Sequence, residues 1–302
     1  MRVYFDYVLP FWVSIGLLSL CQGVVVCLPR AWSPVRMARL SSRLWALIPA
    51  ISVIAFVAVG RVAERDSART LTYLALVAVP LLAALALGWL ARGARPGLAL
   101  LVTPLFALAW ADRGGLAGEG AAVALSALSC VALGALIAGV TPARWLALGI
   151  VAMAAADAAL VVSDLLQGPN DVLNAARPAG GLPRLQAAVF GSATMGYGDL
   201  FVAGVLGGLL ACAREGAVAD DRSRQLTGAV LVVLLAFAFD FLFFVVDELP
   251  ATVPVAGALA ILVLRARRRG VGWVGARAAS APAATPGPSP ASAAPARAPA
   301  PR

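Results

Sequence analysis

Residues 120–140 read GAAVALSALSCVALGALIAGV, an apolar stretch without a charged side chain. A membrane-spanning helix needs roughly 20 predominantly apolar residues, because the hydrocarbon core of a bilayer is about 30 Å thick. The apolar residues are continuous and do not alternate with polar ones, which favours a helix over a strand of a membrane barrel. This stretch alone therefore predicts an integral membrane protein.

The composition of the whole chain agrees with this prediction. Of its 302 residues, 61% are hydrophobic and only 13% are charged, whereas an ordinary globular domain is roughly 45–50% apolar and about 25% charged. A single core cannot bury this excess of apolar surface, so lipid must cover part of it. Backbone N–H and C=O groups within a bilayer must be satisfied internally, and a helix does this within one segment. We therefore expect an all-α, polytopic membrane bundle without a sizeable soluble domain.

Nine apolar runs are candidates for transmembrane helices, the fourth and the ninth being short. The first is too long for the hydrophobic part of a cleaved signal, so we expect it to be retained. We place the spans near residues 5–29, 44–60, 70–91, 97–111, 120–140, 145–166, 187–213, 226–246 and 249–264.

The domain organisation follows from these runs. Residues 1–269 are expected to form the transmembrane domain, with the first six spans in 1–166. The remaining residues, 270–302, include a stretch rich in Ala, Pro and Ser from 278 onward. Such a segment cannot bury a core, so we expect a disordered cytoplasmic tail.

The charge distribution predicts the orientation in the membrane. The net charge is +9, and the 24 basic residues are all Arg, since the chain has no Lys or His. Arg is more frequent in the loops after odd-numbered spans and after the last span, which the positive-inside rule assigns to the cytoplasm. We expect a multi-pass protein of a bacterial-type plasma membrane, with its N-terminus outside and its C-terminus in the cytoplasm. The Arg residues flank spans and form no separate basic domain, so no nucleic-acid partner is expected.

Acidic residues inside the apolar runs are the candidates for function, because a charge at the centre of a bilayer costs about 2.5–3.5 kcal/mol on insertion scales. Asp157, Asp199 and Asp240 lie well inside runs, and Asp164 lies nearer the end of its run. Asp157 and Asp199 are near the middle of consecutive runs, which cross the bilayer in opposite directions. We therefore expect them at similar depth. Two carboxyl groups that share a site cannot both ionise easily, so such a pair holds one proton and can activate a water.

The second of these carboxylates ends the sequence Gly196-Tyr197-Gly198-Asp199. Glycine lowers helix propensity and lets another backbone approach closely, which suits a site that must admit an extended peptide. Glycine suits equally well the tight packing of small residues that is common between membrane helices. The sequence leaves both interpretations of the two glycines open.

In their order along the chain, these residues resemble the GxGD intramembrane aspartyl proteases, the family of presenilin and signal peptide peptidase. That family has nine spans, with one catalytic Asp in the sixth and the GxGD motif, which holds the second, in the seventh. A Pro-Ala-Leu motif begins its ninth span. In this chain Asp157 lies in the sixth run and Asp199 ends the GxGD sequence of the seventh. The sequence that opens the ninth is Pro250-Ala251-Thr252.

This resemblance implies a presenilin-like fold, catalytic-type spans within 145–264, and hydrolysis of peptide bonds in transmembrane peptides or proteins. It implies Asp157 and Asp199 as the catalytic pair and requires no metal ion or cofactor. The absence of His also removes most catalytic triads and zinc sites. The N-out orientation is similar to that of signal peptide peptidase rather than presenilin. The residues that the resemblance implies for shaping the site and holding the substrate are Gly196, Tyr197, Gly198, Pro250, Ala251 and Thr252.

Two positions depart from the family pattern. The family usually has Tyr before its first catalytic Asp, where this chain has Ala156, and the Leu of the third motif is Thr252 here. Asp164 is therefore the alternative to Asp157 as the first catalytic residue. The departures also leave open a homologue without activity.

Three other interpretations use the same residues. The sequence from Thr194 to Asp199 is similar to a potassium-channel selectivity filter, whose backbone carbonyls replace the hydration shell of the ion. The apolar run that follows, Leu200 to Ala213, is too short for a separate inner helix. Type IV prepilin peptidases also use a GxGD motif, but their first Asp usually lies whole spans farther upstream.

A proton-coupled transporter is the third alternative. It would place Asp240, between Phe239 and Phe241, on a proton path through the membrane. The simpler interpretation makes Asp240 a packing residue with a polar partner on another helix.

Overall fold

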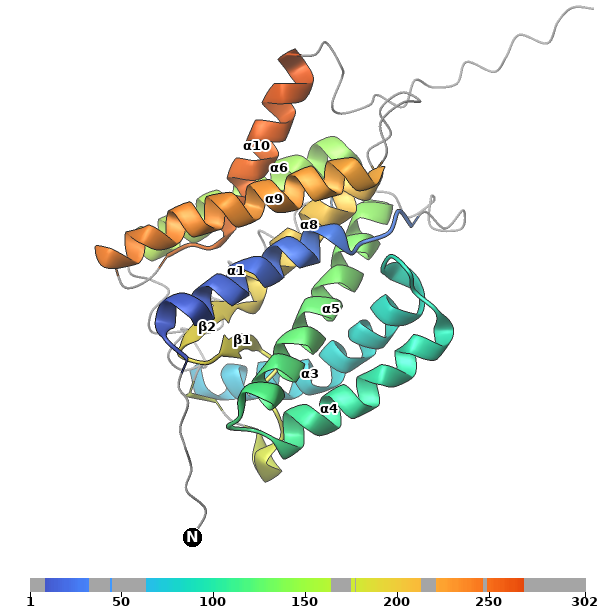
Figure 1. Cartoon of the computed structure of the whole chain (residues 1–302), viewed down its shortest axis with the longest axis vertical. Coiled ribbons are helices and arrows are strands. Elements are labelled where there is room, and N and C mark those ends of the chain that lie inside the picture. Colours follow the sequence, from blue (N-terminus) through green and yellow to red (C-terminus); the bar gives the residue numbers. More distant parts are fainter. Residues whose placement is uncertain are drawn as a thin grey trace, which may run out of the picture.

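The computed structural model describes residues 9–32, 44, 64–163, 175–176, 178–212, 221–246 and 249–268. Within these ranges the chain is mostly helical (Figure 1). The predicted second span at 44–60 lies outside the described residues apart from Leu44, and so do Asp164 and the tail at 270–302. The number of spans in the whole chain and the presenilin-like fold therefore stay predictions.

The elements are described in chain order. A π-helical turn at Ala86–Leu90 extends α3, and a 3-10 helix at Pro96–Leu101 leads into α4. Further 3-10 turns lie at Ala179–Gly181 and, directly after α9, at Phe241–Phe244. The helices and strands are α1 (Phe11–Cys27), α3 (Glu64–Leu85), α4 (Val102–Ala111), α5 (Leu116–Val140), α6 (Ala143–Val162), β1 (Ala187–Phe190), β2 (Ala193–Gly196), α8 (Tyr197–Cys212), α9 (Asp221–Asp240) and α10 (Thr252–Arg268).

Among the described residues, four helical segments are long and apolar enough to cross a membrane. They are Ala68–Leu90, Leu116–Val140, Ala143–Val162 and Arg222–Phe244. Three further apolar helical segments, which comprise α1, α4 with its preceding turn, and α8, are shorter. The described part of the chain is thus a helical bundle with several segments of membrane-spanning length, as the composition predicts.

The predicted seventh span at 187–213 is not one continuous helix. Its first part forms an antiparallel hairpin of β1 and β2, and α8 begins only at Tyr197. The hairpin turn at Gly191-Ser192 gives Gly191 a φ of 58°, a conformation that glycine adopts without strain. The prediction that Asp199 lies near the middle of a helix is therefore wrong, because Asp199 lies in the first turn of α8.

The hairpin turn is held against the beginnings of α1 and α5. The Gly191 N–H donates to Glu119 Oε2 at 2.7 Å, near the start of α5. The Ser192 hydroxyl donates to the Leu9 carbonyl at 2.8 Å, and the Ser192 N–H donates to Ser14 Oγ at 3.3 Å. These bonds fix the hairpin, and with it the point where α8 begins.

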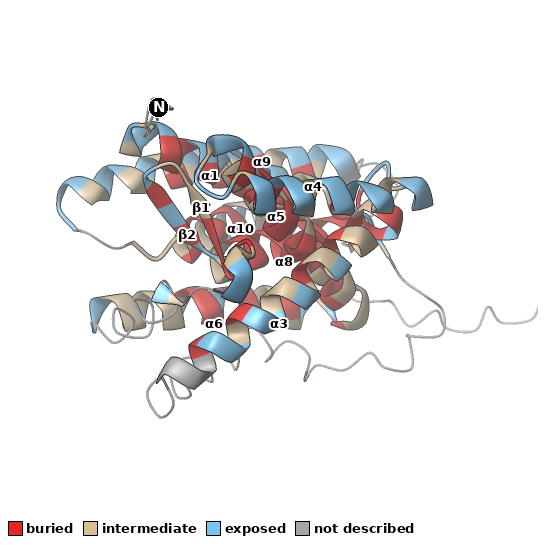
Figure 2. Ribbon diagram, turned by 90° about the horizontal axis from the view of Figure 1, so that it is seen from below, coloured by how far each residue is buried: buried red, intermediate tan, exposed pale blue. Residues whose placement is uncertain are grey.

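The central helix of the bundle is α8. It contacts α1, α5, α6, α9 and α10, and every residue from Leu200 to Ala211 is buried. Figure 2 shows the buried residues gathered in the middle of the bundle, around α5 and α8. The three residues at the beginning of α8, Tyr197 to Asp199, are partly buried.

The backbones of α5 and α8 approach each other closely. A Cβ atom on Gly204 would collide with the carbonyl oxygen of Cys130, and one on Gly208 would collide with the carbonyl oxygen of Gly134. Small residues spaced four positions apart allow membrane helices to pack in this way. These glycines therefore set the distance between α5 and α8, and so the position of Asp199.

Gly204→Ala is expected to lower the free energy of unfolding by about 1–3 kcal/mol, because the added methyl group overpacks the contact between α5 and α8. Gly97→Ala is the matched control, since no atom lies within 4 Å of a Cβ at that position. Denaturant titration of both variants in detergent micelles measures the effect. Equal stability of the two variants would contradict the close approach of the helices.

Candidate active site

A cavity of about 870 Å³ lies among α1, α3, α6, α8 and the adjoining ends of α9 and α10. Ligand pockets commonly have volumes of this order. Most of the side chains that line it are apolar, and the acidic ones are Asp157, Asp199 and Asp240. The fold therefore brings the three carboxylates that lie well inside the apolar runs to one cavity.

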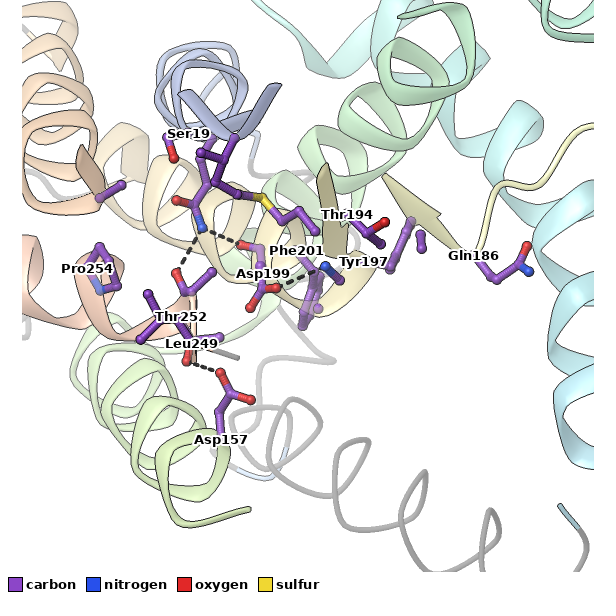
Figure 3. A pocket seen from close by; sticks show the side chains of 18 of the residues that line it. Ser19, Asp157, Gln186, Thr194, Tyr197, Asp199, Phe201, Leu249, Thr252 and Pro254 are labelled. Atoms are coloured by element: carbon purple, nitrogen blue, oxygen red, sulfur yellow. Dashed lines mark hydrogen bonds between the residues drawn. The ribbon is translucent and has the colours of Figure 1, made fainter. Parts of the chain in front are cut away.

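Asp157 is oriented by α10. It lies on α6, and its Oδ2 atom accepts a hydrogen bond of 2.6 Å from Thr252 Oγ1, in the first turn of α10 (Figure 3). Thr252 is only 1% exposed, so bulk water competes little for its hydroxyl group. A hydroxyl that donates to a carboxylate makes a short and strong hydrogen bond. Thr252, the last residue of the Pro250-Ala251-Thr252 sequence, therefore holds the predicted first catalytic Asp.

Asp199 is oriented by its own helix terminus. Its Oδ2 atom accepts a hydrogen bond of 3.1 Å from the N–H of Gly196, directly before α8. An acidic side chain in the first turn that reaches back to the N–H preceding the helix is half of a capping box. A Cβ atom on Gly196 would lie 3.0 Å from the same carboxylate oxygen. The first glycine of the GxGD sequence therefore leaves room for this carboxylate.

The two predicted catalytic residues line the same cavity, one on α6 and one on α8, and these two helices are in contact. Met153 precedes Asp157 by one helical turn on the same face of α6. Its Cε atom lies 3.5 Å from the position that a Cβ of Gly198 would take. Figure 3 shows the Asp157 and Asp199 side chains beside the same space.

Gln22 of α1 connects the second carboxylate with the beginning of α10. Its Nε2 atom donates to the Asp199 carbonyl at 3.3 Å and to the Ala251 carbonyl at 3.0 Å. Gln22 is completely buried. Together with the bond between Thr252 and Asp157, these bonds link α8, α1, α10 and α6. The hydrogen-bond chain fixes the two carboxylates relative to each other.

The remaining predicted site residues differ in their placement. Tyr197 lines the cavity, and its hydroxyl is hydrogen-bonded to Ser129 Oγ of α5 at 2.7 Å. Ala251 also lines the cavity, whereas Pro250 is not among the lining residues. The Pro250 carbonyl accepts a hydrogen bond of 3.0 Å from Val253, as expected where a helix begins.

Asp240, the last residue of α9, has a polar partner on another helix. Ser19 Oγ of α1 donates to Asp240 Oδ2 at 3.0 Å. This contact agrees with the packing interpretation of Asp240, but the residue also lines the cavity.

Ser19 and Gln22 are site residues that the sequence analysis did not single out. Both are polar residues in the first apolar run, and their spacing of three places them on one face of α1. Polar side chains within membrane helices commonly hydrogen-bond to other helices. That rule, applied to the first run, would have identified both.

Comparison of the chain with protein-family models, with curated proteins and with solved structures finds no match. The function therefore has to be argued from the chemistry of the site.

Gln22→Leu is expected to lower the free energy of unfolding by about 1–3 kcal/mol, because two carbonyl groups at the site lose a buried amide donor. Val24→Leu is the control, since Val24 lies on the same helix and is 54% exposed. Denaturant titration compares the two variants. If Gln22→Leu is as stable as the control, the hydrogen-bond chain does not contribute to the fold.

Proposed function

We propose that this protein is an intramembrane aspartyl protease, which hydrolyses peptide bonds within transmembrane segments. One observation carries the proposal: Asp157 and Asp199 line a single cavity, and each is oriented by its own hydrogen bond. Both of these bonds are made to Oδ2 atoms, one from the Thr252 hydroxyl and one from the Gly196 N–H. A pair of carboxyl groups arranged in this way can supply both a base and an acid.

In the proposed reaction the pair holds one proton, with a water between the two carboxyl groups. The ionised Asp takes a proton from the water, whose oxygen attacks the carbonyl carbon of the peptide. The protonated Asp gives its proton to the carbonyl oxygen, and a tetrahedral gem-diol forms. When the C–N bond breaks, the nitrogen takes the proton held by the first Asp. One hydroxyl of the intermediate returns a proton to the second, and an acid and an amine are released.

The surroundings of the pair suit an unwound transmembrane segment as the substrate. The cavity is mostly apolar, and the exposed residues Thr194 and Gly196 of β2 line it beside Asp199. A helical substrate must unwind before a peptide bond can reach the two carboxylates. The orientation expected from the Arg distribution suggests substrates with a cytoplasmic N-terminus.

The conformation of the GxGD sequence favours a protease over a channel. Tyr197, Gly198 and Asp199 form the first turn of α8. A selectivity filter instead needs a run of backbone carbonyls directed at the ion. The alternative function, a proton-coupled transporter, would use the same carboxylates. Cleavage of a transmembrane peptide is expected of the protease and not of the transporter.

Asp157→Asn and Asp199→Asn are each expected to abolish cleavage of a transmembrane peptide in proteoliposomes, since loss of the base or acid costs at least about 10²–10⁴-fold. Both variants should remain folded and inserted. The matched control is Asp112→Asn, which removes the same charge between α4 and α5. There the Asp112 carboxylate accepts a hydrogen bond from the Gly118 N–H. Normal cleavage by both site variants would refute the proposal. Activity that survives Asp157→Asn but not Asp164→Asn would make Asp164 the first catalytic residue.

Thr252→Val is expected to reduce kcat by about 10–100-fold with little change in KM, because Asp157 loses the hydroxyl that orients it. Thr252→Ser keeps the hydroxyl and should retain most of the activity. Steady-state kinetics of the two variants provide the measurement. A Val variant as active as the Ser variant would show that the 2.6 Å bond does not contribute to the reaction.

A further inference from the structure

The cavity holds a third carboxylate, which the proposed reaction does not use. Asp240 lies at the end of α9, is partly buried, and accepts a hydrogen bond from Ser19. Ser19 precedes Gln22 by three residues on α1, or about 4.5 Å along the helix axis. Gln22 in turn bonds to the Asp199 carbonyl. Asp240 therefore lies about one helical turn from the level of the catalytic pair.

A second hydrogen-bond acceptor on the same cavity is without a donor. Gln22 Oε1 is buried and has no hydrogen-bond partner in the described part of the chain. The amide cannot be reversed, because its Nε2 atom already donates to two carbonyl oxygens. A buried acceptor without a donor costs about 1–3 kcal/mol. A ligand that supplies N–H donors would remove this cost.

The charge of the cavity points to the nature of that ligand. Its described lining contains three carboxylates and no Arg, and the chain has no Lys or His at all. A carboxylate in apolar surroundings is costly unless it is paired with a cation. We propose that Asp240, Ser19 and Gln22 Oε1 form a subsite for a basic side chain of the substrate. This inference rests on the proposed function, because the ligand is the peptide that the protease binds.

The position of the subsite indicates where the basic residue lies in the substrate. The turn after α9 exposes Phe241 and Phe244, and the Trp12 ring lies 4.8 Å from that of Phe244. Exposed amphipathic aromatics such as Trp are enriched at membrane–water interfaces, and long basic side chains at helix ends extend to the same level. The preferred substrates are therefore apolar segments with Lys or Arg at one end, cleaved near that end.

Binding to the Asp199→Asn protein in lipid nanodiscs tests the subsite without requiring cleavage. The probes are three labelled peptides with the same Leu/Ala transmembrane segment and a Gly-Gly pair near each end of that segment. One has Lys at its N-terminal end, one has Lys at its C-terminal end, and one has norleucine at both positions. We expect one Lys peptide to bind at least about tenfold more tightly than the norleucine peptide. Adding Asp240→Asn should abolish this difference, and Asp240→Glu should retain it.

Asp112→Asn in the same Asp199→Asn background is the control, because it removes an equal charge away from the cavity. It should leave the Lys preference unchanged. Equal binding of the three peptides, binding of none of them, or a preference that survives Asp240→Asn would overturn the inference. Failure of the unmodified protein to cleave any peptide would refute the proposed protease but would leave a measured Lys preference in place.

Discussion

A carboxylate enclosed in an apolar helical bundle needs a hydrogen-bond donor, and the arrangement of this protein around Asp157 and Asp199 depends on that requirement. One donor comes from the first turn of α10, and the other comes from the backbone directly before α8. Each carboxylate thus has a defined orientation that does not depend on the other. In the proposed reaction, a proton that passes between them would meet carboxyl groups that are already oriented, a form of preorganisation that favours catalysis.

The same requirement explains why α8 is short and why a hairpin precedes it. In a continuous helix through 187–213, the Gly196 N–H would donate to the backbone carbonyl four residues earlier. The Asp199 carboxylate would then lose this hydrogen-bond donor. Because β2 ends at Gly196, the N–H remains available to the Asp199 carboxylate. The glycines at 204 and 208 then bring α8 against α5. The same few residues thus set the backbone geometry and the position of the carboxylate that the proposed reaction uses.

The sequence predicts the helical class of the described chain, and runs such as 120–140, which are long, apolar and free of charge, become helices of membrane-spanning length. It also predicts a shared site for Asp157 and Asp199, which line one cavity, but the reasoning that placed Asp199 at mid-helix is wrong, because α8 begins at Tyr197. The hairpin could not be predicted, since a short apolar strand and a helical segment have the same composition. The role of Gln22 depends on the position of α1 beside the start of α8 and beside Ala251, both of which are far from it in sequence.

The proximity of the two carboxylates is tested most directly by cross-linking between their positions. After replacement of the native cysteines, an Asp157→Cys/Asp199→Cys protein is treated in membranes with a short bis-thiol reagent. A Val151→Cys/Asp199→Cys protein is the comparison, because Val151 is 47% exposed on α6. The account predicts an internal cross-link in the first protein and none in the second. A cross-link in the second but not in the first would contradict it.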